Sequence, residues 1–142
     1  MPEKSYPMVF KFRGGHVALD FCNTVHWRRR PVYTELLTGY DRLIAWARQA
    51  GVLTRAEAVA LRRRATREPA RAEAARRSAI ATRDALHRLL AAQAGGRPPK
   101  PADGRCVGQA LARAGAHAEL RRQGHTYTQR VPAGSFHVDG RR

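Results

Sequence analysis

Residues 69–94 have the sequence PARAEAARRSAIATRDALHRLLAAQA, and the architecture that we expect is built around them. They predict one long helix, because proline is tolerated in a first helical turn and the following Gly95 and Gly96 interrupt the pattern. Arg83 interrupts an otherwise apolar face of this helix. That face consists of Ala72, Ala75, Ala79, Ile80, Leu86, Leu89 and Leu90. A helix of this length indicates a mostly α-helical domain.

Three further helices are predicted on the N-terminal side. Apolar residues at helical spacing predict helices over residues 16–26 and 38–50, and Gly51 is placed to end the second in a left-handed conformation. Thr54 and Glu57 then form the pattern of a capping box, which predicts the start of a third helix.

The C-terminal side is predicted to hold a fifth helix, from a candidate cap at Asp103 to Arg122. Two strand-like segments flank the helices: residues 8–13 alternate apolar and polar side chains, and residues 125–131 have strand propensity. An isolated strand leaves its backbone groups unpaired, so we expect the two segments to form a small antiparallel pair. The fold class is therefore mostly α, with about five helices and short strands near both ends.

Composition limits the class of protein. The domain is expected to span residues 1–131, with a disordered or irregular tail at 132–142. The chain of 142 residues holds 27 Lys and Arg against 11 Asp and Glu, a formal net charge of +16, which attracts polyanions without choosing among them. No apolar stretch approaches the ~20 residues of a membrane span, and the first residues do not resemble a secretion signal. We therefore expect a cytoplasmic protein that has no membrane partner.

The most unusual segment is LDFCNT at residues 19–24. It places Asp20, Asn23 and Thr24 among apolar residues, and a buried carboxylate has to be paired or protonated. Arg83 is its candidate partner. This polar cluster is either a pocket that grips a small ligand or an internal salt bridge that fixes how two helices pack, and the frequency of buried ion pairs in proteins favours the salt bridge.

The sequence offers little for catalysis or metal binding. Cys22 stands between apolar neighbours, which indicates a buried core thiol without a positioned base. The six histidines form no i, i+4 pair and no HExxH motif. We therefore expect no enzymatic activity, no metal and no cofactor in this chain.

Clusters of arginine suggest a second function. The nucleic-acid candidates are Arg28, Arg29, Arg30, Arg62, Arg63 and Arg64. A surface of this kind binds phosphates, but sequence readout also needs an element shaped for a groove, and the pattern gives no convincing helix-turn-helix. The expected interaction with DNA is weak or non-specific.

Three blocks of sequence are similar to the ABATE domain, a family of stress-induced transcription regulators. They are FRGGHVALDFCNTV at residues 12–25, LIAWARQAGVL at 43–53 and TRDALHRLL at 82–90, and the resemblance covers about residues 10–127. The positions that match the family pattern are Gly14, Gly15, Asp20, Asn23, Thr24, Trp46, Gly51 and Arg83. The resemblance implies a regulatory or ligand-sensing domain and no catalytic residue.

In that family a CGNR zinc finger with four cysteines usually follows the domain and is the presumed DNA-binding part. This sequence contains no CxxC motif and no Cys-Gly-Asn-Arg. The resemblance therefore implies zinc only for a finger that is absent here. The leading interpretation is an ABATE-type regulatory domain without its finger, and the alternative is a nucleic-acid-binding module with an arginine-rich surface.

Overall fold

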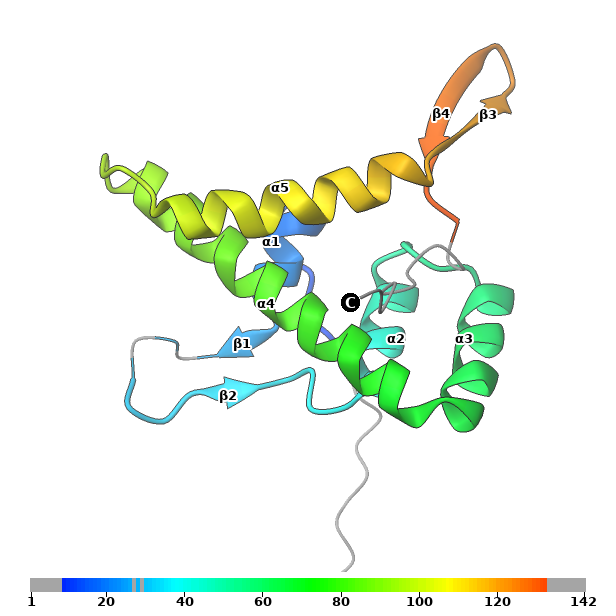
Figure 1. Cartoon of the computed structure of the whole chain (residues 1–142), viewed down its shortest axis with the longest axis horizontal. Helices are drawn as coiled ribbons and strands as arrows, with labels where there is room; N and C mark the ends of the chain where they lie inside the picture. Colours follow the sequence, from blue (N-terminus) through cyan, green and yellow to red (C-terminus); the bar gives the residue numbers. More distant parts are fainter. Residues whose placement is uncertain (1–8, 27, 29, 133–142) are drawn as a thin grey trace, which may run out of the picture.

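The computed structural model describes residues 9–26, 28 and 30–132. Within these ranges five helices and two pairs of short strands form (Figure 1). The elements are α1 (Val17–Cys22), β1 (Val25–His26), β2 (Thr34–Glu35), α2 (Tyr40–Gln49), α3 (Arg55–Arg67), α4 (Pro69–Ala94), α5 (Pro101–Ala116), β3 (Glu119–Gln123) and β4 (Thr126–Arg130). The predicted fold class is confirmed. Of the predicted tail, residues 133–142 lie outside the described part of the chain.

Helix α4 is the axis of the fold. It has the bounds that the sequence predicts, with Pro69 in the first turn and Gly95 following the last residue, where the Gly95 amide donates to the Ala91 carbonyl at 3.0 Å. All four other helices contact it (Figure 1). A side chain on α4 can therefore join segments that are far apart in the sequence.

Helices α2 and α3 pack against each other across a short turn. Gly51 follows α2 with φ of +75°, as its predicted role requires, since this conformation disfavours residues that carry a Cβ. The predicted capping box is confirmed: the Glu57 amide donates to the Thr54 hydroxyl at 3.2 Å, and the Thr54 amide donates to the Glu57 carboxylate at 2.7 Å. Local sequence therefore fixes where α2 ends and α3 begins.

The apolar core lies mainly around α2. Its buried members are Phe10, Leu37, Ile44, Trp46, Ala47, Leu53 and Ala58. The Trp46 ring also meets Phe21 of α1, with ring centroids 4.9 Å apart. The core thus joins α1, α2, α3 and the two non-helical segments that carry Phe10 and Leu37.

The predicted N-terminal strand is wrong over residues 9–13, which form no strand. Phe10 is buried in the helical core, and its amide donates to the Gln49 side chain of α2 at 3.0 Å. Phe10 therefore packs against helices, and the alternating pattern of this segment does not correspond to strand pairing.

The predicted end of the fifth helix and the predicted strand partner are also wrong. Helix α5 ends at Ala116, and β4 pairs antiparallel with β3 and not with the N-terminal segment. Gly124 has φ of +63° in the turn between the two strands. A tight hairpin closed by glycine costs far less loop entropy than pairing across more than 100 residues of chain.

The other strand pair was not predicted. Helix α1 ends at Cys22, and β1 then pairs with β2, so that Val25 lies opposite Glu35. Strands of two residues carry no detectable periodicity. This small pairing is nevertheless what brings Glu35 back toward the end of α1.

Candidate functional site

Arg83 of α4 is the most deeply buried charged group among the described residues, with 1% of its surface exposed. Its Nη1 and Nη2 each donate to one oxygen of the Glu35 carboxylate at 2.7 Å. Nη1 also donates to the Thr24 hydroxyl at 3.1 Å, and Nε donates to Asp84 Oδ1 at 3.0 Å. The guanidinium is therefore engaged along its whole edge, with a two-pronged grip on one carboxylate.

A second arginine completes this cluster. Arg28 donates to Asp84 Oδ1 at 3.0 Å and to the Cys22 carbonyl at 2.9 Å. Two arginines thus face the two carboxylates of Glu35 and Asp84, so the charges balance. We call this set the Arg83 network; its members are Thr24, Arg28, Glu35, Arg83 and Asp84. It ties α4 to the end of α1, to β2 and to the segment after β1.

The electrostatics of the Arg83 network favour the charged forms. Burial alone would raise the pKa of the Glu35 carboxyl, but hydrogen bonds from Arg83 and from the Leu37 amide outweigh it and hold that pKa below its ordinary value. The pKa of Asp84 is lowered in the same way by Arg83 and Arg28 against its own burial. Burial likewise disfavours the Arg83 cation, yet Glu35 and Asp84 raise its pKa.

The predicted partner of Arg83 is wrong. Asp20 is buried, but its Oδ1 accepts a hydrogen bond from the Gly14 amide at 2.7 Å, and Arg83 pairs with Glu35 and Asp84. A Cβ added at Gly14 would lie 2.7 Å from the Leu19 Cβ and 3.1 Å from Asp20 Oδ1, so this close approach needs glycine. Asp20 therefore anchors the turn that precedes α1.

The four residues of the predicted cluster thus separate. Thr24 and Arg83 meet inside the fold, whereas Asn23 is exposed at the C-terminal end of α1. Sequence reasoning missed Glu35 because it lies in a segment without periodicity. Its one available signal was a lone carboxylate directly before Leu36 and Leu37, of which Leu37 is fully buried.

Cys22 behaves as a core thiol. Its Sγ donates to the Arg83 carbonyl at 3.9 Å. Burial raises the pKa of this thiol, although the nearby cations of Arg28 and Arg83 oppose the shift. A thiol whose pKa is raised is a poor nucleophile.

The nucleic-acid candidates fall into different settings. Arg28 belongs to the Arg83 network, Arg30 is exposed, and Arg29 lies outside the described residues. On α3, Arg62 pairs with Asp41 at 3.3 Å and Arg64 lies 3.8 Å from Glu68. Arg63 is exposed and has no ion pair with any described residue.

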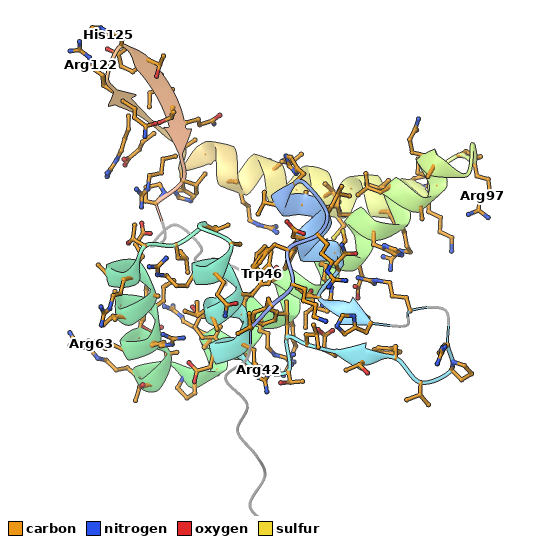
Figure 2. All side chains as sticks on the ribbon, turned by 180° about the vertical axis from the view of Figure 1, so that it is seen from behind. Arg42, Trp46, Arg63, Arg97, Arg122 and His125 are labelled. Atoms are coloured by element: carbon orange, nitrogen blue, oxygen red, sulfur yellow. The ribbon has the colours of Figure 1, made fainter. Side chains whose placement is uncertain are left out.

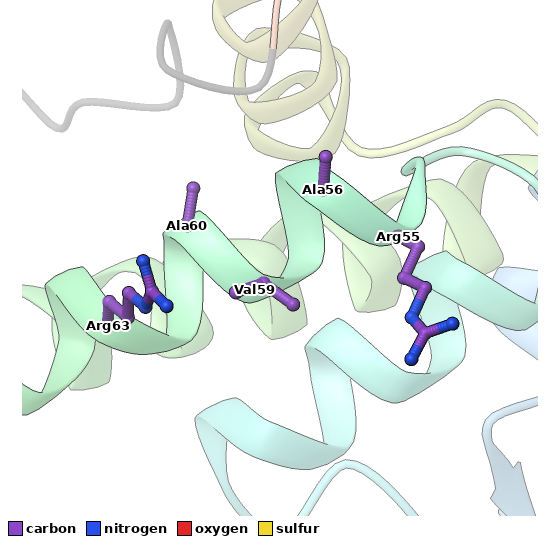
Figure 3. Close-up of a pocket in the computed structure, with 5 residues that line it drawn as sticks. All are labelled: Arg55, Ala56, Val59, Ala60 and Arg63. Atoms are coloured by element: carbon purple, nitrogen blue, oxygen red, sulfur yellow. The ribbon is translucent and has the colours of Figure 1, made fainter.

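Arg63 borders a shallow cavity of about 560 Å³ on the outer surface of α3 (Figure 3). The lining residues are Arg55, Ala56, Val59, Ala60 and Arg63. The two arginines stand toward opposite ends of the small apolar side chains, and Arg55 too has no ion pair within the described ranges. An open, cationic surface of this kind can receive an anion.

No three His, Cys, Asp or Glu side chains in the described ranges come together in a way that could hold a metal ion. No described helix combines the length and the apolar character that crossing a membrane would require.

Comparison with known proteins gives one match. The ABATE family model, whose description is "Putative stress-induced transcription regulator", matches residues 15–140. No curated protein and no solved structure matches the chain. The matched range includes every member of the Arg83 network.

Proposed function

This chain belongs to the ABATE family, and on that premise we propose that it is a regulatory domain in the stress-induced control of transcription, without enzymatic activity of its own. The observation that carries the proposal is the family match over residues 15–140. The proposal includes no cofactor for this chain; the charges of Arg83, Glu35 and Asp84 pair with one another.

In this proposal the Arg83 network has a structural role: it holds α4 against the segments that carry Thr24 and Glu35. The predicted ligand site consists of Asp20, Asn23, Thr24 and Arg83. A small effector that binds the Arg83 guanidinium there would have to displace the Glu35 carboxylate or the Thr24 hydroxyl, because both already accept hydrogen bonds from it. Displacing the carboxylate would strand a buried charge, which is costly. If a small molecule controls this domain, we place its site elsewhere.

The test is a transcript profile. In the native host, the gene is replaced by the wild-type gene, by an Arg83→Met version or by an Asp41→Asn version, and RNA is sequenced before and after several stresses. We expect Arg83→Met to alter a defined set of stress-induced transcripts. Asp41→Asn is the control, since Asp41 takes part only in an exposed ion pair with Arg62. A strain in which the gene is deleted is profiled alongside these three, and identical profiles for the deletion and the wild type under every stress would overturn the proposal.

One observation favours a second candidate function, a nucleic-acid-binding module. Arg55 and Arg63 are eight residues apart on α3, so their backbones are separated by about 12 Å along one face of the helix. Neither has a carboxylate partner among the described residues, whereas Arg62 and Arg64 do. Two arginines without carboxylate partners on one helix face are suited to phosphate contacts, and we call Arg55 and Arg63 the α3 row.

This second candidate is tested by a salt titration of duplex DNA binding. If the α3 row contacts phosphates, Arg55→Gln with Arg63→Gln should reduce the slope of log affinity against log salt by about 2, because each lost contact contributes about 1. The matched control is Arg62→Gln with Arg64→Gln, which removes two ion-paired arginines. Equal slopes for the two double variants would exclude a specific role for the α3 row.

A further inference from the structure

The hairpin of β3 and β4 stands apart from the helices. It extends from the end of α5 away from the body of the molecule (Figure 1). Every residue from Glu119 to Gln129 is exposed, including Leu120 at 74% and Tyr127 at 68%. At its base, Arg130 forms an ion pair with Glu57 on α3. A two-stranded hairpin with both faces in water is only marginally stable, so a partner that covers one face would stabilise it.

The pairing register sorts the side chains of the hairpin into two faces. Leu120 lies opposite Gln129, and Arg122 lies opposite Tyr127. Cross-strand partners share a face, and alternate residues along a strand do too, so these four side chains share one face. We call it the Arg122 face. Arg121 points to the opposite side.

The Arg122 face carries groups suited to base edges. The Nε of Arg122 donates to the Gly124 carbonyl at 3.0 Å, which orients the side chain and leaves both Nη groups available. Arginine and glutamine are the side chains that pair in two-pronged fashion with guanine and adenine. Leu120 and Tyr127 add apolar surface on the same face. The opposite face differs, because the hydroxyls of Thr126 and Thr128 bond to the hairpin's own carbonyls.

The charge of the hairpin selects an anionic partner. Arg121, Arg122 and Arg130 outnumber the single carboxylate of Glu119, which lies opposite Arg130 in the register. The whole chain has a net charge of +16. A second copy of this chain seated on the hairpin would bring like charges together. Charge complementarity therefore argues for a polyanion over self-association.

The dimensions of the hairpin fit one kind of polyanion. Two five-residue strands make a ribbon roughly 17 Å long, and the major groove of B-form DNA, about 12 Å wide, admits a two-stranded ribbon. The major groove of double-stranded RNA is deep and too narrow for side chains to read. From its exposure, its charge and its shape, we propose that the β3–β4 hairpin docks in the major groove of duplex DNA with the Arg122 face toward the bases. This inference rests on the proposed role in transcription and names the partner for it.

Two neighbouring arginines provide a matched pair for the test. Full-length protein is bound to a pool of 20-base-pair DNA duplexes of random sequence, the bound fraction is selected through several rounds, and affinity for the selected duplex is measured by fluorescence anisotropy. We expect Arg122→Ala to weaken binding about tenfold or more, as loss of a two-pronged base contact does. Arg121→Ala removes the same charge from the opposite face of the same hairpin and should weaken binding less than about threefold.

A distant variant controls for overall charge. Arg97, in the turn between α4 and α5, lies far from the hairpin tip that carries Arg122 and His125 (Figure 2). Arg97→Ala should leave the affinity for the selected duplex nearly unchanged. Equal losses for the variants at 97, 121 and 122 would reduce the interaction to general electrostatic attraction and overturn the inference.

Four further outcomes would also overturn it. The first is a selection that enriches no sequence, and the second is equal affinity for double-stranded RNA of the selected sequence. The third is a wild-type dimer in analytical ultracentrifugation that Arg122→Ala dissociates, since a second copy would then occupy the hairpin. If no duplex binds at all, the hairpin assignment fails while the transcript profile still decides the regulatory function. Thermal melts of each variant establish that the fold is retained.

Discussion

At the scale of single residues, Arg83 is a cation that is almost completely buried. Its two-pronged contact with Glu35 and its third bond to Asp84 replace the solvent that it lost. A buried ion pair of this kind adds little stability over an apolar replacement of both partners, but removing one partner leaves the other charge buried and uncompensated. The consequence of a substitution therefore depends on which charges it leaves behind.

Arg83→Met should lower the free energy of unfolding by about 3 kcal/mol, the lower end of the cost of breaking a buried pair, because the Glu35 carboxylate that it leaves unpaired is partly exposed and Asp84 keeps Arg28. The measurement is urea unfolding followed by circular dichroism. The control is Arg77→Met on the same helix, where an exposed arginine shares Glu73 with Arg76; its expected cost is below about 0.5 kcal/mol. Indistinguishable unfolding midpoints for the two variants would contradict the structural role of the network.

Asp20→Ala tests the separate role of Asp20. The substitution removes the acceptor of the Gly14 amide, so we expect a loss of about 1–2 kcal/mol. Asp20 and Arg83 form no ion pair with each other. Their effects in the double variant should therefore add to within about 0.5 kcal/mol. A coupling energy well above that value in the same urea experiment would restore the direct pairing that the sequence suggested.

At the scale of elements, a capping box marks where α3 begins. Thr54→Ala should destabilise the protein by about 1 kcal/mol, because the Glu57 amide loses its cap at the start of α3. Thr66→Ala is the matched control on the same helix, since the Thr66 hydroxyl only bonds back to the Arg62 carbonyl. That variant should stay within about 0.5 kcal/mol of wild type in thermal unfolding. A larger loss at Thr66 than at Thr54 would show that the capping box contributes little.

The contrast between helices and strands shows what local sequence can specify. Helix α4 could be predicted to the residue, because proline at one end and glycine at the other act within a single turn. Strand β4 falls within the predicted segment 125–131. The other strands could not be predicted, because β1 and β2 are two residues long and β3 has the helix-compatible sequence ELRRQ. The choice of strand partner depends on the entropy of closing the loop and on tertiary contacts. Periodicity in the sequence indicates neither of these.

The candidate site was predictable only where a local pattern in the sequence identifies a residue. A lone arginine on the apolar face of a long helix identified Arg83 as a buried charge, and Thr24 was correctly placed among its neighbours. Its carboxylate partner could not be chosen, since Asp20 and Glu35 are both near apolar residues in sequence. Only the reversal of the chain through β1 and β2 brings Glu35 to Arg83.

At the scale of the whole molecule, the Arg83 network joins segments that otherwise have few reasons to stay together. Helix α4 contributes Arg83 and Asp84, the segment between α1 and β1 contributes Thr24, and β2 contributes Glu35. Opening any one of these segments exposes the charges of the others. The global stability of the protein should therefore depend on the ionisation of the two carboxylates.

That dependence predicts a loss of stability in acid. Because the pKa values of Glu35 and Asp84 are lower in the folded chain than their ordinary values of 4.5 and 3.8, the unfolded chain binds more protons as the pH falls through that range. The stabilisation is complete above the ordinary values and is lost below them. Glu73, whose pKa the neighbouring Arg76 lowers to about 2, contributes in the same direction.

Urea unfolding at a series of pH values should show this decline. A Glu35→Gln variant should be less stable near neutrality but should decline less steeply in acid, because its residue 35 no longer titrates. Parallel curves for the variant and the wild type would mean that the ionisation of Glu35 does not hold the three segments together.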